Sequence, residues 1–350
     1  MSKVNLIIPT HNRTEYLKRI LNYYQMGQTD FDFIIADSST PRIRAENKKI
    51  ISSYSTLSIL YIDDFDKRLA QSQKFAEMVK YAGNKYVVFC ADDDFIIPSA
   101  IKKCVDFLER NPDYSAAHGD YIGFQLYRNL LGLKTFGWNL RYSPISIISK
   151  KPSDRLDSYL RENTQVLWSV RRTNIVKACY KEFSKVKLDP YLIAILGEFI
   201  PDALTVIFGK VKQLNIFYGA RQYFGSVLSF YPNFRDAQKN GKYDDEFTKI
   251  EKCFIENLRN VENISEDNAS NIINSAMKQS INSSYQQYLV NRIYFTLKDY
   301  PFLSNLVKLL HTNYLFSKKR KGFIDRINMS SPENFKDFDS IRHLVLQSNL

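Results

Sequence analysis

The sequence lacks several features that would place it in familiar classes of protein. Its 350 residues contain no stretch of about 20 consecutive apolar residues, so we expect no membrane-spanning helix. The apolar run from Val4 to Ile8 is too short for the core of a signal peptide and ends at Pro9, so no secretory leader is expected. The four cysteines are far apart and form no Cys-x-x-Cys pair. They predict neither a zinc site nor a disulfide framework and favour a reducing compartment, the cytoplasm.

Two common phosphate-binding motifs are missing as well. No Gly-x-Gly-x-x-Gly follows the first predicted strand, which argues against a dinucleotide-binding domain, and no Walker A lysine motif occurs. The formal net charge of +12 nevertheless predicts anionic partners: nucleotides, phosphorylated lipids, an acidic membrane surface or nucleic acid. Any bound phosphate must therefore be held by something other than a glycine-rich loop.

What the sequence does contain is an alternation of short apolar runs and stretches with helical periodicity, up to about residue 125. Apolar runs with polar exits predict strands, and the stretches between them predict helices. This alternation predicts an α/β fold, a doubly wound and mainly parallel sheet with right-handed crossovers. The predicted strands are 4–8, 33–36, 57–62, 86–91 and 114–125, and the predicted helices are 14–25, 42–54, 67–82 and one that follows Pro98.

The remainder of the chain mixes further elements and then changes in composition. From about residue 231, Asn, Lys, Ser and Glu become abundant and helical patterns replace strands, so we place a domain boundary near residue 230. This divides the chain into an α/β domain, 1–230, and a mainly helical region, 231–350. Between 126 and 230 we predict an irregular segment over 126–150, helices over 154–161 and 173–183, a strand over 166–170, a helix through Pro201 to 208, and a strand over 211–218.

Three consecutive aspartates, Asp92, Asp93 and Asp94, follow the apolar run 86–91 directly. Clustered carboxylates at the end of a buried strand repel one another, and a divalent cation would remove that cost while binding the oxygens of a substrate phosphate. Acidic clusters are also commonly solvated turns, so the motif alone leaves both interpretations open. In parallel sheets, ligands bind beyond the carboxyl ends of the strands. Polar residues collect at the other predicted strand ends too: Thr10 to Arg13, Asp37 to Ser39, and Asp63 with Asp64.

Taken together, these segments resemble the family 2 glycosyltransferases with the GT-A fold, most closely a bacterial branch with an Ala-Asp-Asp-Asp-Phe strand end. The resemblance covers residues 3–125 well and 160–220 loosely. Three segments carry it: Pro9 to Arg13 followed by Leu17, which is similar to the family's opening; Asp37-Ser38-Ser39, similar to its second-strand acidic turn; and Tyr86 to Asp94 followed by Pro98, similar to its metal-binding DxD strand.

The resemblance implies an activity and a donor site. It implies an inverting glycosyltransferase that needs Mn²⁺ or Mg²⁺ and moves a sugar from a nucleotide sugar, with a UDP-sugar favoured, to a glycan or glycolipid acceptor in cell-surface polysaccharide synthesis. Asp37 could instead be a turn former or helix cap, and Arg68 could belong to a solvated basic pair. The residues implied for the donor are Pro9, Thr10, Asn12, Arg13, Asp37, Arg68, Asp92 and Asp93, and those implied for the metal are Asp92, Asp93 and Asp94.

The acceptor side needs a general base that takes the proton from the attacking hydroxyl. In the family an acidic residue at the start of a helix does this, and the matching segment, 197–204, contains Glu198 and Asp202. We favour Glu198 as the base and Asp202 as an acceptor-binding or orienting residue, although both could simply complement the helix N-terminus. His118 and Trp168 are weaker acceptor candidates, because such residues more often belong to the core.

The sequence leaves alternatives open for the C-terminal region and for the function of the protein. An apolar helical stripe after Pro301 precedes a basic cluster, so this region could contact an anionic membrane peripherally at its inner face or pack on the α/β domain. A nucleotidyltransferase is disfavoured because the loop after the first strand has no glycine. A non-catalytic nucleotide- or nucleic-acid-binding protein is disfavoured because no recognition module occurs, and we expect no nucleic-acid partner. The basic cluster consists of Lys318, Lys319, Arg320 and Lys321.

Overall fold

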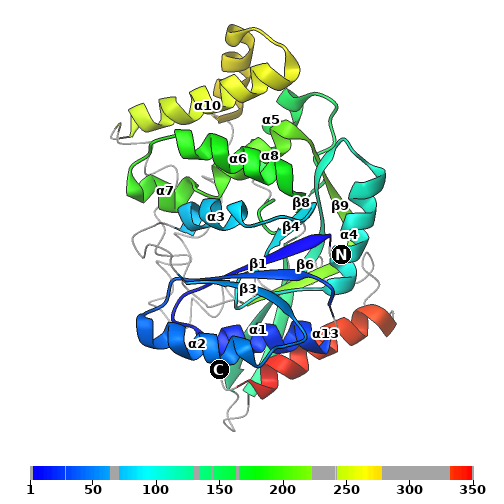
Figure 1. Ribbon diagram of the computed structural model, residues 1–350. Helices are drawn as coiled ribbons and strands as arrows, with labels where there is room; N and C mark the ends of the chain where they lie inside the picture. Colours follow the sequence, from blue (N-terminus) through cyan, green and yellow to red (C-terminus); the bar gives the residue numbers. More distant parts are fainter. Residues whose placement is uncertain are drawn as a thin grey trace, which may run out of the picture.

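The computed structural model describes residues 3–27, 29–63, 71–128, 134–142, 145–162, 165–222, 241, 243–277 and 332–348. Its centre is a nine-stranded sheet in the order β3-β2-β1-β4-β8-β6-β9-β5, with β7 paired to β6 (Figure 1). The strands are β1 Val4–Thr10, β2 Asp32–Asp37, β3 Ser58–Ile62, β4 Tyr86–Phe89, β5 Phe95–Ile96, β6 Tyr114–Arg128, β7 Lys134–Tyr142, β8 Val170–Arg172 and β9 Lys210–Gln222.

Helices cover both sides of the sheet, as an α/β fold requires (Figure 1). On one side lie α1 Thr14–Met26, α2 Pro41–Ser52 and α13 Pro332–Gln347. On the other side lie α3 Gln71–Lys80, α5 Pro152–Glu162, α6 Thr173–Lys185, α7 Pro190–Leu196, α8 Phe199–Phe208 and α10 Asp244–Glu262. Helix α4, Pro98–Arg110, packs against β6 and β9.

The N-terminal half of the sheet is parallel and confirms the α/β prediction. Strand β1 pairs in parallel with β2 and β4, and β2 pairs in parallel with β3. The β1 side chains Leu6, Ile7 and Ile8 are fully buried, as are all four residues of β4. A strand buried on both faces reads as an uninterrupted apolar run, which is why these strands could be predicted. The carboxyl ends of β1, β2 and β4 therefore meet at one edge of the sheet.

Two predictions for the second half of the sheet were wrong. The segment predicted to be irregular contains β7, which pairs with β6 and stacks Phe136 on Phe124 at a ring separation of 5.1 Å. The strand predicted over 166–170 is instead the short β8, antiparallel to both β4 and β6. Val166 and Leu167 cannot join the sheet, because their backbone N–H groups donate to the carboxylate of Asp202.

The described part of the C-terminal region is helical and packs on the sheet domain. Helix α10 contacts α5 and α8, whereas α13 contacts α1 and β7 on the opposite side. Ile341 and Val345 of α13 are fully buried. Among the described residues, no helix is both long and apolar enough to cross a bilayer. The predicted stripe after Pro301, the basic cluster 318–321 and Arg68 lie outside the described residues.

Candidate active site

The loops that follow β1 and β2 are joined by backbone and side-chain hydrogen bonds. Asn12 adopts the left-handed conformation (φ 54°), which asparagine tolerates better than most residues. In this conformation its N–H donates to Ser39 Oγ at 2.7 Å, and its Oδ1 accepts from Thr40 N at 2.9 Å. The hydroxyl of Ser38 also lies 3.0 Å from Lys74 Nζ, which reaches it from α3. The two loops thus form one rigid edge.

Asp37 ends β2, and protein groups hold its carboxylate. Its side chain is fully buried. One carboxylate oxygen accepts from Ser39 N at 2.8 Å, and the other accepts from Asn47 Nδ2 and Tyr61 Oη, both at 2.7 Å. Asp37 therefore ties β2 to α2 and β3, as the turn-forming alternative expects, and its contact with a nucleotide base stays a prediction.

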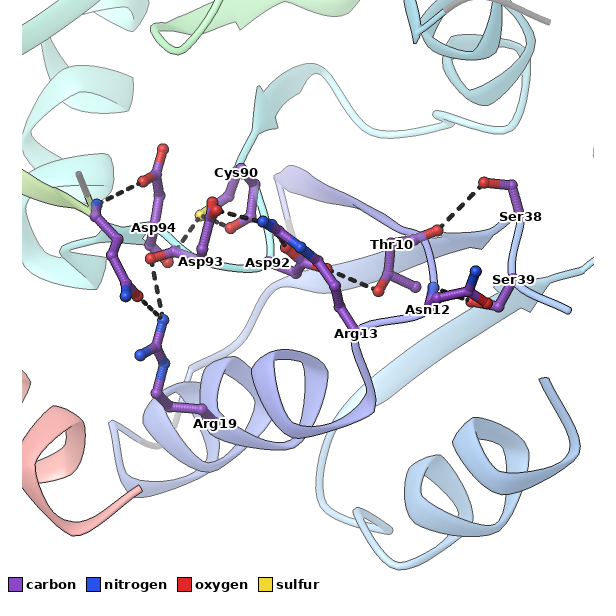
Figure 2. Close-up of polar contacts among 12 residues, drawn as sticks. Thr10, Asn12, Arg13, Arg19, Ser38, Ser39, Cys90, Asp92, Asp93 and Asp94 are labelled. Carbon is purple, nitrogen blue, oxygen red and sulfur yellow. Dashed lines mark hydrogen bonds and ion pairs between the residues drawn. The ribbon is translucent and has the colours of Figure 1, made fainter. Parts of the chain in front are cut away.

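Asp92 and Asp93 face the loop after β1. Thr10 Oγ1 donates to Asp92 Oδ2 at 2.8 Å, and Arg13 Nη1 donates to Asp92 Oδ1 at 2.9 Å and to Asp93 Oδ2 at 2.7 Å (Figure 2). Arg13 lies at the N-cap of α1, and its guanidinium rests over the ring of Tyr16 at 4.8 Å. A single guanidinium thus bridges the strand end and the first helix.

Asp94 turns away from its neighbours and faces the end of β9. Its carboxylate accepts from Arg221 Nε at 2.8 Å and from the backbone N–H of Gln222 at 3.0 Å. The strand approaches this closely because residue 219 is glycine; a Cβ there would lie 2.5 Å from the carbonyl oxygen of Phe95. Arg19 of α1 completes the connection, since its Nη2 donates to the Asp93 carbonyl at 3.2 Å and to Gln222 Oε1 at 2.7 Å (Figure 2).

The sequence suggested that the three aspartates bind one metal ion together. In the structure, Asp94 faces away from Asp92 and Asp93. Among the described residues, no group of three His, Cys, Asp or Glu side chains is placed to hold a metal ion. Asp92 and Asp93 nevertheless contact the same nitrogen atom of Arg13, so their carboxylates converge on a point that already accommodates a positive charge. Mg²⁺ commonly takes one or two carboxylates plus substrate phosphate oxygens, so this pair fits such an ion without Asp94.

Burial perturbs the charges of this cluster. It raises the pKa of Asp92 and of Asp94 to about 6, despite the opposing effects of Arg13 on the first and Arg221 on the second. Burial lowers the pKa of Arg13, but Asp92 and Asp93 raise it by more, so the guanidinium stays charged. Burial also lowers the pKa of Arg19 to about 10. At neutral pH the cluster is therefore a set of ionised, mutually compensating groups.

Glu198 and Asp202 lie one turn apart at the start of α8 but in different surroundings. Asp202 is only 3% exposed, and its Oδ2 accepts from Val166 N at 2.9 Å and Leu167 N at 3.0 Å. Its Oδ1 lies 3.8 Å from Nη1 of the fully buried Arg171. Glu198 is half-buried, and burial raises its pKa while Arg221 opposes that rise. Asp202 thus anchors the backbone of Val166 and Leu167, and its burial raises its pKa to about 7; its role toward the acceptor stays a prediction.

His118 and Trp168 are also less accessible than an acceptor contact requires. His118 is 1% exposed, and burial lowers its pKa to about 4, so it is neutral near pH 7. The indole of Trp168 is buried under the guanidinium of Arg221 at 4.7 Å. Its backbone carbonyl accepts from the hydroxyls of Tyr121 and Tyr218. These positions favour the interpretation that His118 and Trp168 belong to the hydrophobic core.

Three cations at the site were missed by sequence analysis: Arg19, Lys74 and Arg221. Arg19 could have been noticed, because it falls three residues after Tyr16 and four before Tyr23, on the flank of the apolar stripe of α1. Arg221 lies at the carboxyl end of a predicted strand, where ligand-facing residues collect. Lys74 carried no such signal, since a lysine on a helix is usually solvated.

Comparison with known proteins identifies the family to which the chain belongs. The sequence profile of Glycosyl transferase family 2 matches residues 5–181, about half of the chain. The chain therefore belongs to glycosyltransferase family 2 and is a glycosyltransferase with the GT-A fold. Among curated proteins, none matches its sequence significantly.

Solved structures of S. aureus TarS share this fold. TarS 1–349 in complex with UDP-GlcNAc is similar with a TM-score of 0.53 and 15% identity, over 79% of this chain and 72% of that one. The crystal structure of TarS 1–349 gives a TM-score of 0.51 at 13% identity, over 80% and 71% of the two chains. The complex of TarS 1–349 with UDP gives 0.50 at 14% identity, over 78% and 70%. At such identities the likeness concerns the fold alone.

Proposed function

We propose that this enzyme transfers a sugar from a nucleoside diphosphate to a hydroxyl of a glycan or glycolipid, with inversion at the anomeric carbon. The observation that carries this proposal is the convergence of Thr10, Arg13, Asp92 and Asp93 at the joined ends of β1 and β4. Ligands of parallel sheets bind at such ends. The binding of UDP-GlcNAc and UDP by TarS favours a UDP-sugar as donor.

The donor diphosphate lies, in this proposal, against Arg13 and the paired carboxylates of Asp92 and Asp93. Pro9 and Asn12 shape the loop next to it, and Lys74 adds a further cation from α3. A Mn²⁺ or Mg²⁺ ion held by Asp92 and Asp93 would act as a Lewis acid that stabilises negative charge on the leaving group. Arg13 would stabilise the same charge directly, since guanidinium groups pair well with phosphate oxygens.

Glu198 is the general base of the proposed reaction. It takes the proton from the acceptor hydroxyl as the oxygen bonds to the anomeric carbon and the bond to the diphosphate breaks. Its half-buried position supports this role, because burial raises its pKa above the ordinary 4.5 and makes the carboxylate a stronger base. Asp202 acts indirectly by anchoring the segment that leads to Trp168.

The proposal extends to the location and the domain organisation of the enzyme. We place the enzyme in the bacterial cytoplasm, where it would serve cell-surface polysaccharide synthesis; the four cysteines are free and buried, which suits a reducing compartment. In this proposal the catalytic domain covers residues 1–230, and the described helices after it, α10 and α13, pack on that domain. Lys318, Lys319, Arg320 and Lys321 would provide a peripheral contact with anionic lipid.

The test is release of free nucleotide from a panel of UDP-, GDP- and CMP-sugars, measured with Mn²⁺, with Mg²⁺ and with excess EDTA. We expect slow hydrolysis of one donor class with metal and none in EDTA. Glu198→Gln should not abolish donor binding. If no donor in the panel binds or turns over under any condition, the proposed substrate class is wrong.

A further inference from the structure

Buried polar atoms gather between β8 and the helices α6 and α8, which pack on each other on one side of the sheet (Figure 1). The central side chain of this group is Arg171 of β8, which is fully buried. Strand β8 pairs with β4 at Val87 and with β6 at Ala116, so Arg171 stands in the interior of the sheet. Its guanidinium carbon lies 5.2 Å from the centre of the Phe89 ring. The charge of Arg171 is therefore held away from bulk water.

The guanidinium of Arg171 makes no direct hydrogen bond within the part of the chain that the structure describes. None of its three nitrogen atoms has a partner there. Asp202 Oδ1 faces it from α8, but the separation from Nη1 is 3.8 Å, too long for a hydrogen bond, and Oδ1 has no other partner among these residues. The same is true of the buried hydroxyl of Tyr180 on α6, whose ring packs edge-on against Phe89 at 6.2 Å between ring centres. Polar groups from three elements thus lack the hydrogen bonds that buried groups normally make.

The chemistry of these groups narrows what can complete their hydrogen bonds. A guanidinium only donates, a carboxylate only accepts, and a hydroxyl does both. An anion would be attracted by Arg171 but repelled by Asp202, and a cation would meet the opposite forces. Water both accepts and donates, and it commonly bridges polar groups that lie more than about 3.5 Å apart. A buried charge without any such partner would be strongly destabilising.

We propose that Arg171, Asp202 and Tyr180 form a binding site for ordered internal water. A water molecule at this site accepts from Arg171 Nη1 and donates to Asp202 Oδ1, so that the 3.8 Å approach becomes a water-bridged ion pair. Further water completes the hydrogen bonds of the other guanidinium nitrogens and of the Tyr180 hydroxyl. Burial raises the pKa of Asp202, and Arg171 opposes that rise. A water molecule that donates to the carboxylate opposes it further.

This site supports the segment that leads to Trp168. The carboxylate that receives the water through Oδ1 holds the N–H groups of Val166 and Leu167 through Oδ2. A water-bridged Arg171 thus keeps Asp202 oriented for both backbone hydrogen bonds. The role does not depend on which sugar or acceptor the enzyme uses, so the proposed function can fail without affecting it.

A high-resolution crystal structure of the full-length protein tests the inference directly. We expect ordered water within hydrogen-bond distance of both Arg171 Nη1 and Asp202 Oδ1, and further ordered water beside the hydroxyl of Tyr180. A guanidinium that pairs directly with Asp202, or the lack of ordered water between the two side chains, would overturn the inference.

The sign of a stability change provides a second test. Tyr180→Phe deletes the hydroxyl and keeps the ring. If the hydroxyl binds water, its loss should lower Tm by about 1–2 °C, the shift expected for one lost hydrogen bond in a chain of this length. Removing a buried hydroxyl that has no partner would instead leave Tm unchanged or raise it, and either result would contradict the proposed site. Tyr81→Phe is the matched control: this side chain is 47% exposed, and the change should not alter Tm.

Discussion

At the scale of single residues, two acids one helical turn apart, Glu198 and Asp202, lie in different surroundings. Asp202 Oδ2 accepts two backbone N–H groups, and its Oδ1 lies 3.8 Å from Arg171 without a hydrogen bond, so the carboxylate is buried in the core. Glu198 is half-buried and is influenced by Arg221, which also holds Asp94. The dipole of α8 acts most strongly on Asp202 and favours its ionised form. Glu198 is the more exposed of the two acids, which favours it as the base that contacts the substrate.

Replacing Glu198 with Gln tests its role as base. We expect turnover to fall by about 10²–10⁴-fold while donor affinity stays unchanged, the range typical of a lost general base. In the wild type, activity should fall as the pH drops through the pKa of Glu198, which burial raises above 4.5, and the variant should lose this acid limb. Rates and donor dissociation constants over a pH series measure both. A variant that keeps wild-type turnover would place the base elsewhere.

Replacing Asp202 with Ala tests its role as anchor. The change would leave Arg171 as a buried charge without a counter-ion and two N–H groups without an acceptor, so we expect a loss of about 3 kcal/mol or more in the free energy of unfolding. Urea denaturation monitored by circular dichroism gives this value. Glu198→Gln serves as the matched control and should cost far less. Equal stability of the Asp202→Ala variant and the wild type would contradict the structural role.

The sequence predicted which residues come together where the ends of neighbouring strands meet. It did not predict contacts between residues that are distant in the sequence and not on neighbouring predicted strands. Thr10, Arg13, Asp92 and Asp93 come together because β1 and β4 are neighbours. The function of Asp94 could not be predicted, since Arg221 lies 127 positions away and reaches it only through β9. From the sequence, the clustered acids could bind a metal or be solvated, whereas in the fold they pair with Arg13 and Arg221.

At the scale of helices and strands, the described C-terminal helix α13 is part of the folded core. Ile341 and Val345 are fully buried, and Phe338 packs against Trp138 and Phe136 of β7 at ring separations of 5.3 and 5.9 Å. Strand β7 was not recognised from the sequence, because its apolar face is completed only by this helix and by β6. The parallel strands β1, β2 and β4, buried on both faces, needed no such distant partner and were predicted correctly.

The contribution of α13 can be measured with a pair of substitutions. Ile341→Ala should destabilise the protein by about 2–4 kcal/mol, because it removes buried methyl groups and leaves a cavity. Phe335→Ala on the same helix, where the side chain is 58% exposed, should change stability by less than about 0.5 kcal/mol. Thermal or chemical denaturation distinguishes them. If the two variants are equally stable, α13 does not pack on α1 and β7 as described.

At the scale of the whole molecule, the net charge of +12 bears on where the enzyme works. We expect that replacing Lys318, Lys319, Arg320 and Lys321 with Ser weakens binding to anionic vesicles, since each basic residue near such a surface contributes about 1 kcal/mol. Turnover of a water-soluble acceptor should stay the same. Vesicle sedimentation at low and physiological salt measures the difference. Unchanged sedimentation would favour a basic cluster that is only solvated.

Most central to the proposed function is that Asp92 and Asp93 bind a nucleoside diphosphate sugar together with a divalent ion. Isothermal titration calorimetry with UDP-GlcNAc, with and without Mn²⁺, tests it directly in the wild type, in Asp93→Asn and in the control Asp113→Asn. Asp113 lies in a separate ion pair with Lys210 at 2.6 Å. We predict that the donor binds the wild type and the control tightly only with Mn²⁺, and that Asp93→Asn loses this binding while remaining folded. Equal donor affinity in excess EDTA, or in Asp93→Asn with Mn²⁺, would contradict the claim.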